Sequence, residues 1–108
     1  MSVKISSSPQ RLTIALGGEL DHHSAAAMRQ EADAAIEAKL SPKVRLDFSA
    51  VTFMDSAGVG FVLGRYRLVN SYGGRVEVTG LDQRLYRMMR MAGLERLVTL
   101  CKKEGKKK

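Results

Sequence analysis

The sequence is poor in cysteine, proline and aromatic residues. It contains one cysteine (Cys101), two prolines and no tryptophan, and aromatic residues make up 6% of the chain. A single cysteine cannot form an internal disulfide. The first ten residues also lack the apolar run of a secretory signal, so we expect a protein of the reducing cytoplasm.

Long hydrophobic runs are also missing. The stretch richest in apolar residues, 51–69, contains Asp55, Arg65 and Arg67. A membrane-spanning helix does not readily tolerate three charged side chains. We therefore expect no transmembrane segment and no membrane partner.

Acidic residues are fewer than basic ones, which gives a formal net charge of +7. A basic surface can indicate a nucleic-acid-binding protein. However, residues 102–108 contain five lysines and one glutamate, so they account for +4 and residues 1–101 for only +3. We interpret 102–108 as a solvated, frayed C-terminal tail and expect no direct nucleic-acid partner.

The remaining composition is that of a soluble globular protein, with 44% hydrophobic and 27% charged residues. A chain of 108 residues forms one domain by the usual size relation. We assign this single domain to residues 1–101.

The hydrophobic pattern predicts an α/β fold. Alternating residues at 3–8 and 11–16 predict two strands, joined in an antiparallel hairpin at Pro9–Gln10, and Gly17–Gly18 is expected to end the second. A helix capped by Asp21 or Ser24 should follow. The later elements are expected as a strand at 44–48, a connection at 49–54, a helix at 58–69, a strand at 75–79, a helix between Asp82 and Gly93, a turn at 94–96 and a strand at 97–101.

This order, ββαβαβαβ, predicts a mixed, mostly parallel sheet that is opened by an antiparallel strand pair and covered by helices. Parallel neighbours need crossover connections, and the predicted helices supply them. We therefore expect a single α/β domain.

Residues that could support catalysis do not form a recognised set. His22 and His23 are adjacent, and adjacent side chains rarely bind one zinc ion. The chain has no GxSxG nucleophile motif and no further histidine to act as a base for Ser56. We therefore expect neither a metal site nor an enzyme.

The glycines after Ser56 allow a second interpretation. Gly58, Gly60 and Gly64, with Glu77 further on, faintly resemble a dinucleotide-binding fingerprint, but the spacing is one residue too long and a phosphate-binding GxxxxGK[ST] loop is missing. A structural alternative is that Gly60 and Gly64 permit close helix packing. A nucleotide-binding module and a small basic nucleic-acid-binding domain remain the alternative functions.

The most informative stretch is 51–69, with the pair Asp55–Ser56 at its pivot. Ser56 can be an ordinary helix N-cap. Composition alone favours this interpretation. The same geometry would also suit a phosphate acceptor, because helix-start amides could hold a phosphoryl group. Met54, just before this pair, is either an ordinary core residue or lies near the interaction face.

Three segments carry a resemblance to a known family. GGELDHHSA at 17–25, LDFSAVTFMDSAGVGFVLGRYR at 46–67 and GGRVEVTGL at 73–81 closely resemble the STAS-domain anti-anti-sigma factors, especially the anti-sigma F factor antagonists of spore-forming bacteria. The resemblance spans the chain up to about residue 100 and implies a single STAS domain.

The resemblance also implies a function in transcription regulation. The unmodified proteins of this family bind an anti-sigma factor that is a serine kinase, and this binding releases a sigma factor, as in sporulation. The kinase uses its own ATP and magnesium to phosphorylate the serine after the aspartate, and a serine phosphatase reverses the step. In this sequence that serine is Ser56, and the protein needs no cofactor of its own.

The resemblance further implies a docking face for the partner. By position it consists of Asp21, His22, Asp55, Ser56, Ala57, Gly58 and Gly60. Many relatives have Ser or Thr where this chain has Ala57, so only one hydroxyl is available at this motif.

Overall fold

The structure is a computed structural model that describes residues 2–103. Strands and helices alternate after an initial strand pair, in the predicted order ββαβαβαβ. The elements are β1 (Ser2–Ser8), β2 (Arg11–Leu20), α1 (Ala25–Lys39), β3 (Lys43–Met54), α2 (Ser56–Asn70), β4 (Arg75–Leu81), α3 (Gln83–Met91), the 3₁₀ turn η1 (Leu94–Arg96) and β5 (Thr99–Lys102).

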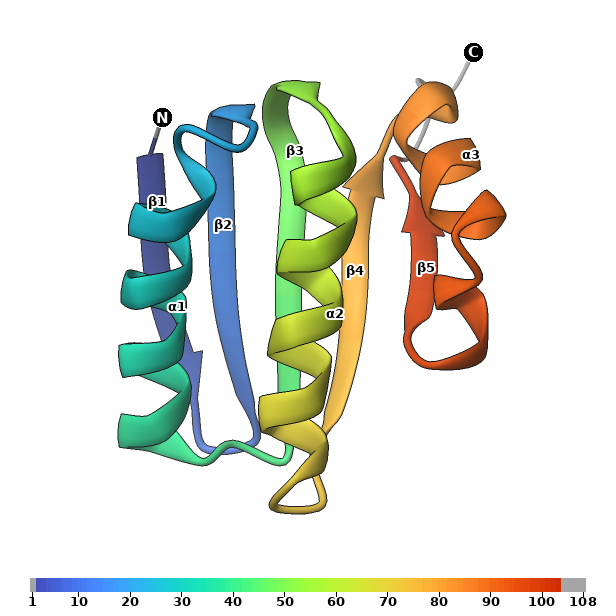
Figure 1. Cartoon of the computed structure of the whole chain (residues 1–108). Helices are drawn as coiled ribbons and strands as arrows, with labels where there is room; N and C mark the ends of the chain where they lie inside the picture. Colours follow the sequence, from blue (N-terminus) through green and yellow to red (C-terminus); the bar gives the residue numbers. More distant parts are fainter. Residues whose placement is uncertain (1, 104–108) are drawn as a thin grey trace, which may run out of the picture.

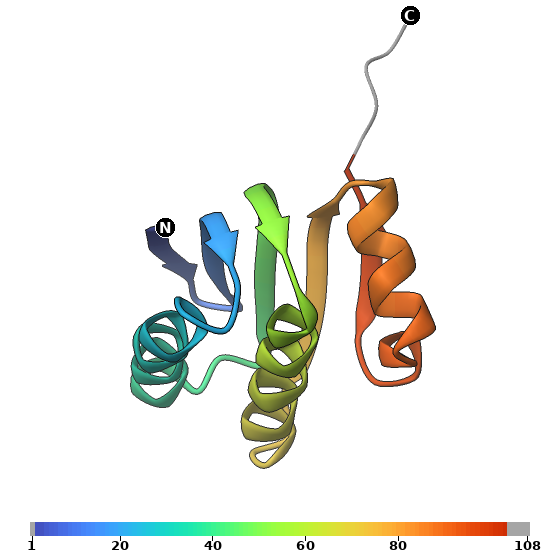
Figure 2. The same cartoon turned by 45° about the horizontal axis from the view of Figure 1, so that its top comes forward.

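The strands form one mixed sheet in the order β1-β2-β3-β4-β5 (Figure 1). β1 pairs antiparallel with β2, and the other neighbours pair in parallel. Because each parallel strand is added on the same side of the previous one, right-handed crossovers place all the helices on one face of the sheet. Figure 2 shows α1, α2 and α3 together on that face. The predicted mixed α/β fold is confirmed.

The core lies between the helices and the sheet. Side chains alternate between the two faces of a strand. In β2, Leu12, Ile14 and Leu16 are buried under the helices, whereas Thr13 and Ala15, on the opposite face, are half-buried. The helices contribute Met28, Ala32, Ile36, Phe61, Val62, Val69, Leu85 and Met89 to the same cluster. This packing fixes the helix starts relative to the strand ends.

Strand β2 does not end at Gly17–Gly18, as we expected, but continues to Leu20. The two glycines lie in an irregular part of the β2–β3 ladder, with register shifts on both sides of them, and Gly18 has φ = 81°. A Cβ on Gly17 would lie 2.6 Å from the Ser2 hydroxyl on β1. These glycines therefore permit a bulge and a close strand approach and do not terminate the strand.

Residues 49–54, expected as a connection, are the second half of β3. They pair with the last residues of β2 beyond the bulge. Small and polar residues such as Ser49 and Thr52 interrupt the alternation, so the sequence did not reveal this extension. As a result, β2 and β3 project together to the edge of the sheet.

The C-terminal strand also differs from the expectation. It spans Thr99–Lys102 and so takes up the first residue of the predicted tail. The Lys103 amide then donates to the Leu81 carbonyl at 2.7 Å. The rest of the tail, 104–108, lies outside the described residues. Within residues 2–103, no helix is long and apolar enough to cross a membrane.

Candidate functional site

The candidate site forms where β2 and β3 end. These parallel strands pair Glu19 with Phe53 and Leu20 with Met54. The residue that follows each strand is an aspartate, Asp21 after β2 and Asp55 after β3. The strand register therefore places two predicted site residues at one position on the carboxyl edge of the sheet.

Asp55 caps helix α2. Its backbone is extended, its carboxylate Oδ1 accepts from the Ala57 amide at 2.8 Å, and its carbonyl accepts from the Gly58 amide at 2.9 Å. The pKa of Asp55 lies below its ordinary value, mainly because the Ala57 amide donates to the carboxylate, with a further contribution from His22. A negative charge at a helix start is also favourable.

Ser56 is the first residue of α2, so the N-cap interpretation of Ser56 is wrong and the cap is Asp55. Ser56 is exposed, and its hydroxyl has no hydrogen-bond partner among the described side chains and backbone groups. Because the Ala57 and Gly58 amides are already engaged by Asp55, few helix-start amides are free to hold a phosphate. A phosphate on Ser56 would instead stand beside an ionised carboxylate.

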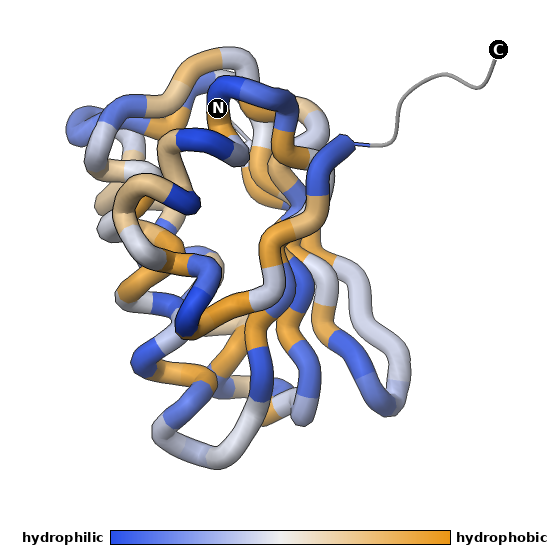
Figure 3. Tube along the Cα trace, turned by 90° about the vertical axis from the view of Figure 1, so that its right-hand side faces the viewer, coloured by the Kyte–Doolittle hydropathy of each residue, from blue (hydrophilic) through white to orange (hydrophobic). Residues whose placement is uncertain are grey.

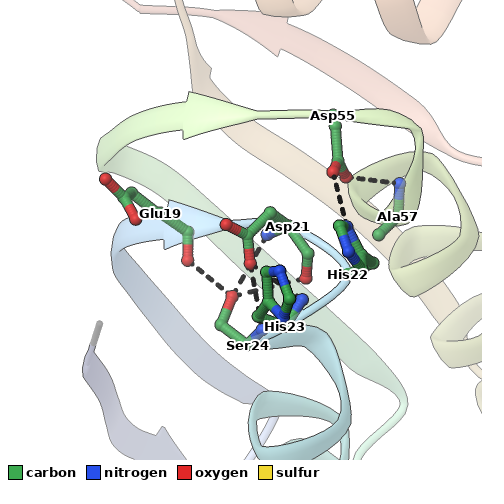
Figure 4. Close-up of polar contacts among 7 residues, drawn as sticks. All are labelled: Glu19, Asp21, His22, His23, Ser24, Asp55 and Ala57. Atoms are coloured by element: carbon green, nitrogen blue, oxygen red, sulfur yellow. Dashed lines mark hydrogen bonds and ion pairs between the residues drawn. The ribbon is translucent and has the colours of Figure 1, made fainter.

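Asp21 organises the turn that leads from β2 to α1 (Figure 4). Its Oδ1 accepts from the amides of His23 and Ser24, each at 3.0 Å. The Ser24 hydroxyl donates to the Glu19 carbonyl at 2.7 Å. The pKa of Asp21 lies below its ordinary value, mainly because of the Ser24 amide. Ser24 is the N-cap residue of α1 but makes no side-chain cap bond.

His22 connects the two aspartate segments. Its Nδ1 lies 3.5 Å from Asp55 Oδ2, and its side chain is 73% exposed (Figure 4). The His22 and His23 rings lie 4.0 Å apart between centroids. Within residues 2–103, no three His, Cys, Asp or Glu side chains come close enough to hold a metal ion.

Gly58 and Met54 lie beneath the site. Met54 is 1% exposed, so it belongs to the core and lies beneath the residues predicted for the interaction face. A Cβ on Gly58 would lie 2.1 Å from Met54 Cγ. Gly58 is itself buried, so it allows the start of α2 to pack onto Met54 and contributes little surface to a partner.

Gly60 and Gly64 lie beside the site and line a groove between α1 and α2. A Cβ on either residue would meet nothing within 4 Å, so close helix packing does not explain these glycines. The groove has a volume of about 440 Å³. Its walls are His22, Ala25, Ala26, Arg29, Ala57, Gly60, Phe61, Gly64 and Arg65. The groove therefore continues the surface formed by His22, Ala57 and Gly60.

Two residues near the site were missed by sequence reasoning. Phe53 at the end of β3 is 45% exposed, an unusual position for a large apolar side chain and one that suits contact with a partner. Arg65 is 5% exposed and pairs with Asp33 of α1, with 2.6 Å between Nε and Oδ1. The sequence pattern does not predict that Arg65 is buried, because a charged residue in a helix is usually assigned to the solvent-exposed face.

Comparison with known proteins places this geometry in context. A family model described as "Mlab, STAS domain" matches residues 3–99. An anti-sigma F factor antagonist from Paenibacillus polymyxa is 36% identical over 89 residues, which cover 82% of this chain and 76% of the relative. The anti-sigma-B factor antagonist of Bacillus subtilis (strain 168) is 26% identical over 106 residues, covering 97% of this chain and 95% of the relative.

Solved structures show the same arrangement. The anti-sigma factor antagonist SpoIIAA in its unphosphorylated form superposes with a TM-score of 0.77 at 28% identity, covering 92% of this chain and 87% of that chain. The phosphorylated form of SpoIIAA, a Bacillus cell fate determinant, gives a TM-score of 0.72 at 28% identity, covering 92% of this chain and 90% of that chain. The fold and order of elements predicted from the sequence are those of these proteins.

Proposed function

This chain belongs to the STAS-domain family, and from that premise we propose that it is an antagonist of an anti-sigma factor. The unphosphorylated protein binds the anti-sigma factor, and this binding releases a sigma factor for transcription. The observation that carries the proposal is the exposed Ser56 hydroxyl at the first residue of α2, beside Asp55. The relatives named as antagonists of anti-sigma factors support the same function.

The docking face in this proposal is the carboxyl edge of β2 and β3. It comprises Asp21, His22, Asp55, Ser56, Ala57 and Gly60, and Gly58 supports it from below. The exposed Phe53 is an apolar contact at the same edge. Hydrogen bonds within the Asp21 turn and at the Asp55 cap hold these residues in place before a partner arrives, which reduces the entropy lost on binding.

Phosphorylation of Ser56 is the proposed switch. A phosphoserine carries about −1.5 to −2 charges at neutral pH. Beside the ionised Asp55 this charge would be costly to bury under a partner, because repulsion and desolvation act together. A hundredfold loss of affinity corresponds to about 2.7 kcal/mol, which one desolvated phosphate can supply.

The chemistry of the switch belongs to the partners. The anti-sigma factor is proposed to be a serine kinase that supplies ATP and magnesium, and a serine phosphatase restores the active form. The protein itself acts by binding and not by catalysis. The site of action is proposed to be the cytoplasm, where a transcription regulator meets its sigma factor.

The test is a phosphorylation assay with the cognate anti-sigma kinase, ATP and magnesium, read by intact-protein mass. The wild type should gain one phosphate and Ser56→Ala none. Ser6→Ala, which removes an exposed hydroxyl from β1, is the matched control and should still gain one. Phosphate mapped to another residue would overturn the assignment of Ser56.

A further inference from the structure

The net charge of the chain is confined to its last quarter. Residues 1–82 contain nine Lys or Arg and nine Asp or Glu, so they are neutral. Residues 83–108 contain nine Lys or Arg against two acidic residues and so carry the whole +7. The described part of this segment, 83–103, holds six of these cations and only one acid, Glu95.

In the structure three of these cations, Arg87, Arg90 and Lys102, line a hollow between α3 and β5. We call it the α3–β5 hollow, and it is lined by Gln83, Tyr86, Arg87, Arg90, Met91 and Lys102. Its volume is about 400 Å³, which is the size of a site for a few side chains. Figure 3 views the molecule from this side, where hydrophilic positions alternate with apolar ones.

The walls of the hollow combine apolar surface with cationic groups. Met91 is 81% exposed and supplies apolar contact area. Lys102 Nζ lies 4.8 Å from the centroid of the Tyr86 ring, and the Arg90 guanidinium lies 6.0 Å from it. Arg90 already holds one carboxylate, since its Nε lies 2.9 Å from Glu95 Oε1. The hollow can therefore bind a carboxylate group next to an apolar side chain.

The hollow runs along α3, and one end of it lies at the same edge of the sheet as the docking face. Gln83 begins α3 directly after β4, and Lys102 is the last residue of β5. Ser56 begins α2 directly after β3. Because β3, β4 and β5 are parallel, all three residues lie at the carboxyl edge. One partner can therefore cover Ser56 and reach the hollow.

We infer that the anti-sigma partner places an acidic segment in the α3–β5 hollow, with its carboxylates against Arg87 and Lys102 and an apolar side chain against Met91. The inference rests on the proposed function, which it extends with a second contact. This contact adds affinity and faster association without involving Ser56, because complementary charges steer encounter.

Two other anionic partners fit less well. A nucleic-acid base would stack on an open aromatic face, whereas the Tyr86 ring is approached by two cations. A membrane surface suits the hollow less well, because Met91 is the single strongly exposed apolar side chain among its lining residues and Tyr86 is half-buried within it. An acidic protein segment suits both the shape and the mixed lining.

The test measures binding of the cognate anti-sigma factor by calorimetry at two salt concentrations. We expect Arg87→Glu/Lys102→Glu to bind about tenfold or more weakly than the wild type and to lose most of the salt dependence. Lys4→Glu/Lys43→Glu makes the same charge change at exposed positions away from the hollow and should bind nearly as the wild type does. Thermal melts would verify that both variants fold.

A second measurement locates the contact without a variant. A carbodiimide should join the Lys102 amine of the wild type to an Asp or Glu of the bound partner, identified by peptide mass.

The outcomes separate the inference from the function on which it rests. Partner binding that is weakened equally by both double variants, or by neither, would overturn the inference and leave the proposed function intact. No binding by the wild type would overturn both. Binding of an oligonucleotide or of anionic phospholipid vesicles that Arg87→Glu/Lys102→Glu abolishes, while partner binding persists, would reassign the hollow to that ligand.

Discussion

Asp55 has two structural roles with a single carboxylate. One oxygen caps α2 through the Ala57 amide, and the other faces His22 across the gap between the two loops. The cap fixes where the helix begins and therefore where Ser56 stands. At the scale of the residue, the proposed switch at Ser56 therefore depends on its neighbour Asp55, which is already ionised.

The first prediction concerns Asp55 and pH. Because the pKa of Asp55 is lowered in the folded state, its contribution to stability is present above the ordinary value of 3.8 and is lost as the pH falls through the folded-state value. Asp55→Asn keeps a good cap but removes the charge. Thermal melts should show the wild type as the more stable protein at pH 7, with the difference vanishing towards pH 2. A difference that stays constant over this range would contradict the prediction.

The second prediction concerns charge at Ser56. Ser56→Asp should weaken binding of the anti-sigma factor by about tenfold or more, because a second carboxylate beside Asp55 must be desolvated under the partner. The fold should persist, since Ser56 is exposed and an acidic side chain suits a helix start. Calorimetry and circular dichroism would measure the two effects. Ser6→Asp is the control with equal charge, and unchanged affinity in Ser56→Asp would count against charge-controlled docking.

At the scale of elements, the junction of β3 and α2 positions the site. Met54 ends the strand inside the core, and the buried Gly58 packs against it one turn into the helix. The chain thus turns from strand to helix with only Asp55 between them. The junction has little room for a larger side chain at its buried position.

This gives the third prediction. Gly58→Ala should lower the free energy of unfolding by about 1–3 kcal/mol, because its Cβ would overlap Met54 in a packed core. Gly60→Ala, two residues further on, meets open space and should leave stability unchanged or raise it by up to about 1 kcal/mol. Urea denaturation would measure both. Equal losses in the two variants would show that the effect comes from helix geometry and not from Met54.

Helices α1 and α2 are joined by the ion pair of Asp33 and Arg65. The Arg65 side chain is 6% exposed and that of Asp33 30%, and Arg65 also donates to the Phe61 carbonyl. Burial lowers the pKa of Arg65, and the charge of Asp33 partly offsets this effect. Removing Asp33 and removing Arg65 should therefore lower the free energy of unfolding by different amounts.

The fourth prediction tests this inequality. Asp33→Ala leaves a buried guanidinium without its carboxylate and should cost about 3 kcal/mol of unfolding free energy. Arg65→Met removes the buried charge while keeping apolar volume and should cost less than about 1.5 kcal/mol. Chemical denaturation of both variants would decide. Equal costs would mean that the pair contributes as a packing contact only.

At the scale of the whole molecule, one sheet carries all three helices on a single face. Its central strand, β3, is paired on both sides, whereas β1 at the edge is paired on one side and most of its side chains are exposed. Stability should therefore be unequal across the sheet.

The fifth prediction follows from this difference in stability between β3 and β1. In amide hydrogen exchange read by peptide mass, residues 44–48 of β3 should exchange slowest and residues 2–8 of β1 fastest among the strands. The reason is that the β3 amides open only when the core opens, whereas β1 can detach while the rest of the sheet stays paired. Equal protection in the two strands would contradict this account.

The sequence predicted the fold well where residues alternate or recur regularly, as in β1, β4 and α1. It failed at 49–54, because small and polar residues there pair with β2 through a bulge that local pattern cannot reveal. It assigned the cap of α2 to Ser56 because Asp55 and Ser56 are both good caps, and only the backbone distinguishes them.

The candidate site was less accessible to local reasoning. Spacing alone singled out Asp55–Ser56, whereas Asp21 and His22 entered through the family resemblance. Their proximity to Asp55 depends on the register of β2 against β3, which is a long-range property. Arg65 and Phe53 were missed because their burial and exposure oppose the usual preference of their residue types.

The in-register ends of β2 and β3 restrict how the length of this chain can change. One residue inserted into either strand beyond the bulge would move its aspartate by about 3.3 Å and turn later side chains to the opposite face. Insertions leave this surface in place at the opposite edge, for example in the exposed Pro9–Gln10 turn between β1 and β2. Length variation among functional relatives should therefore concentrate at that edge, and the Pro9–Gln10 turn is a suitable position for inserting a reporter domain.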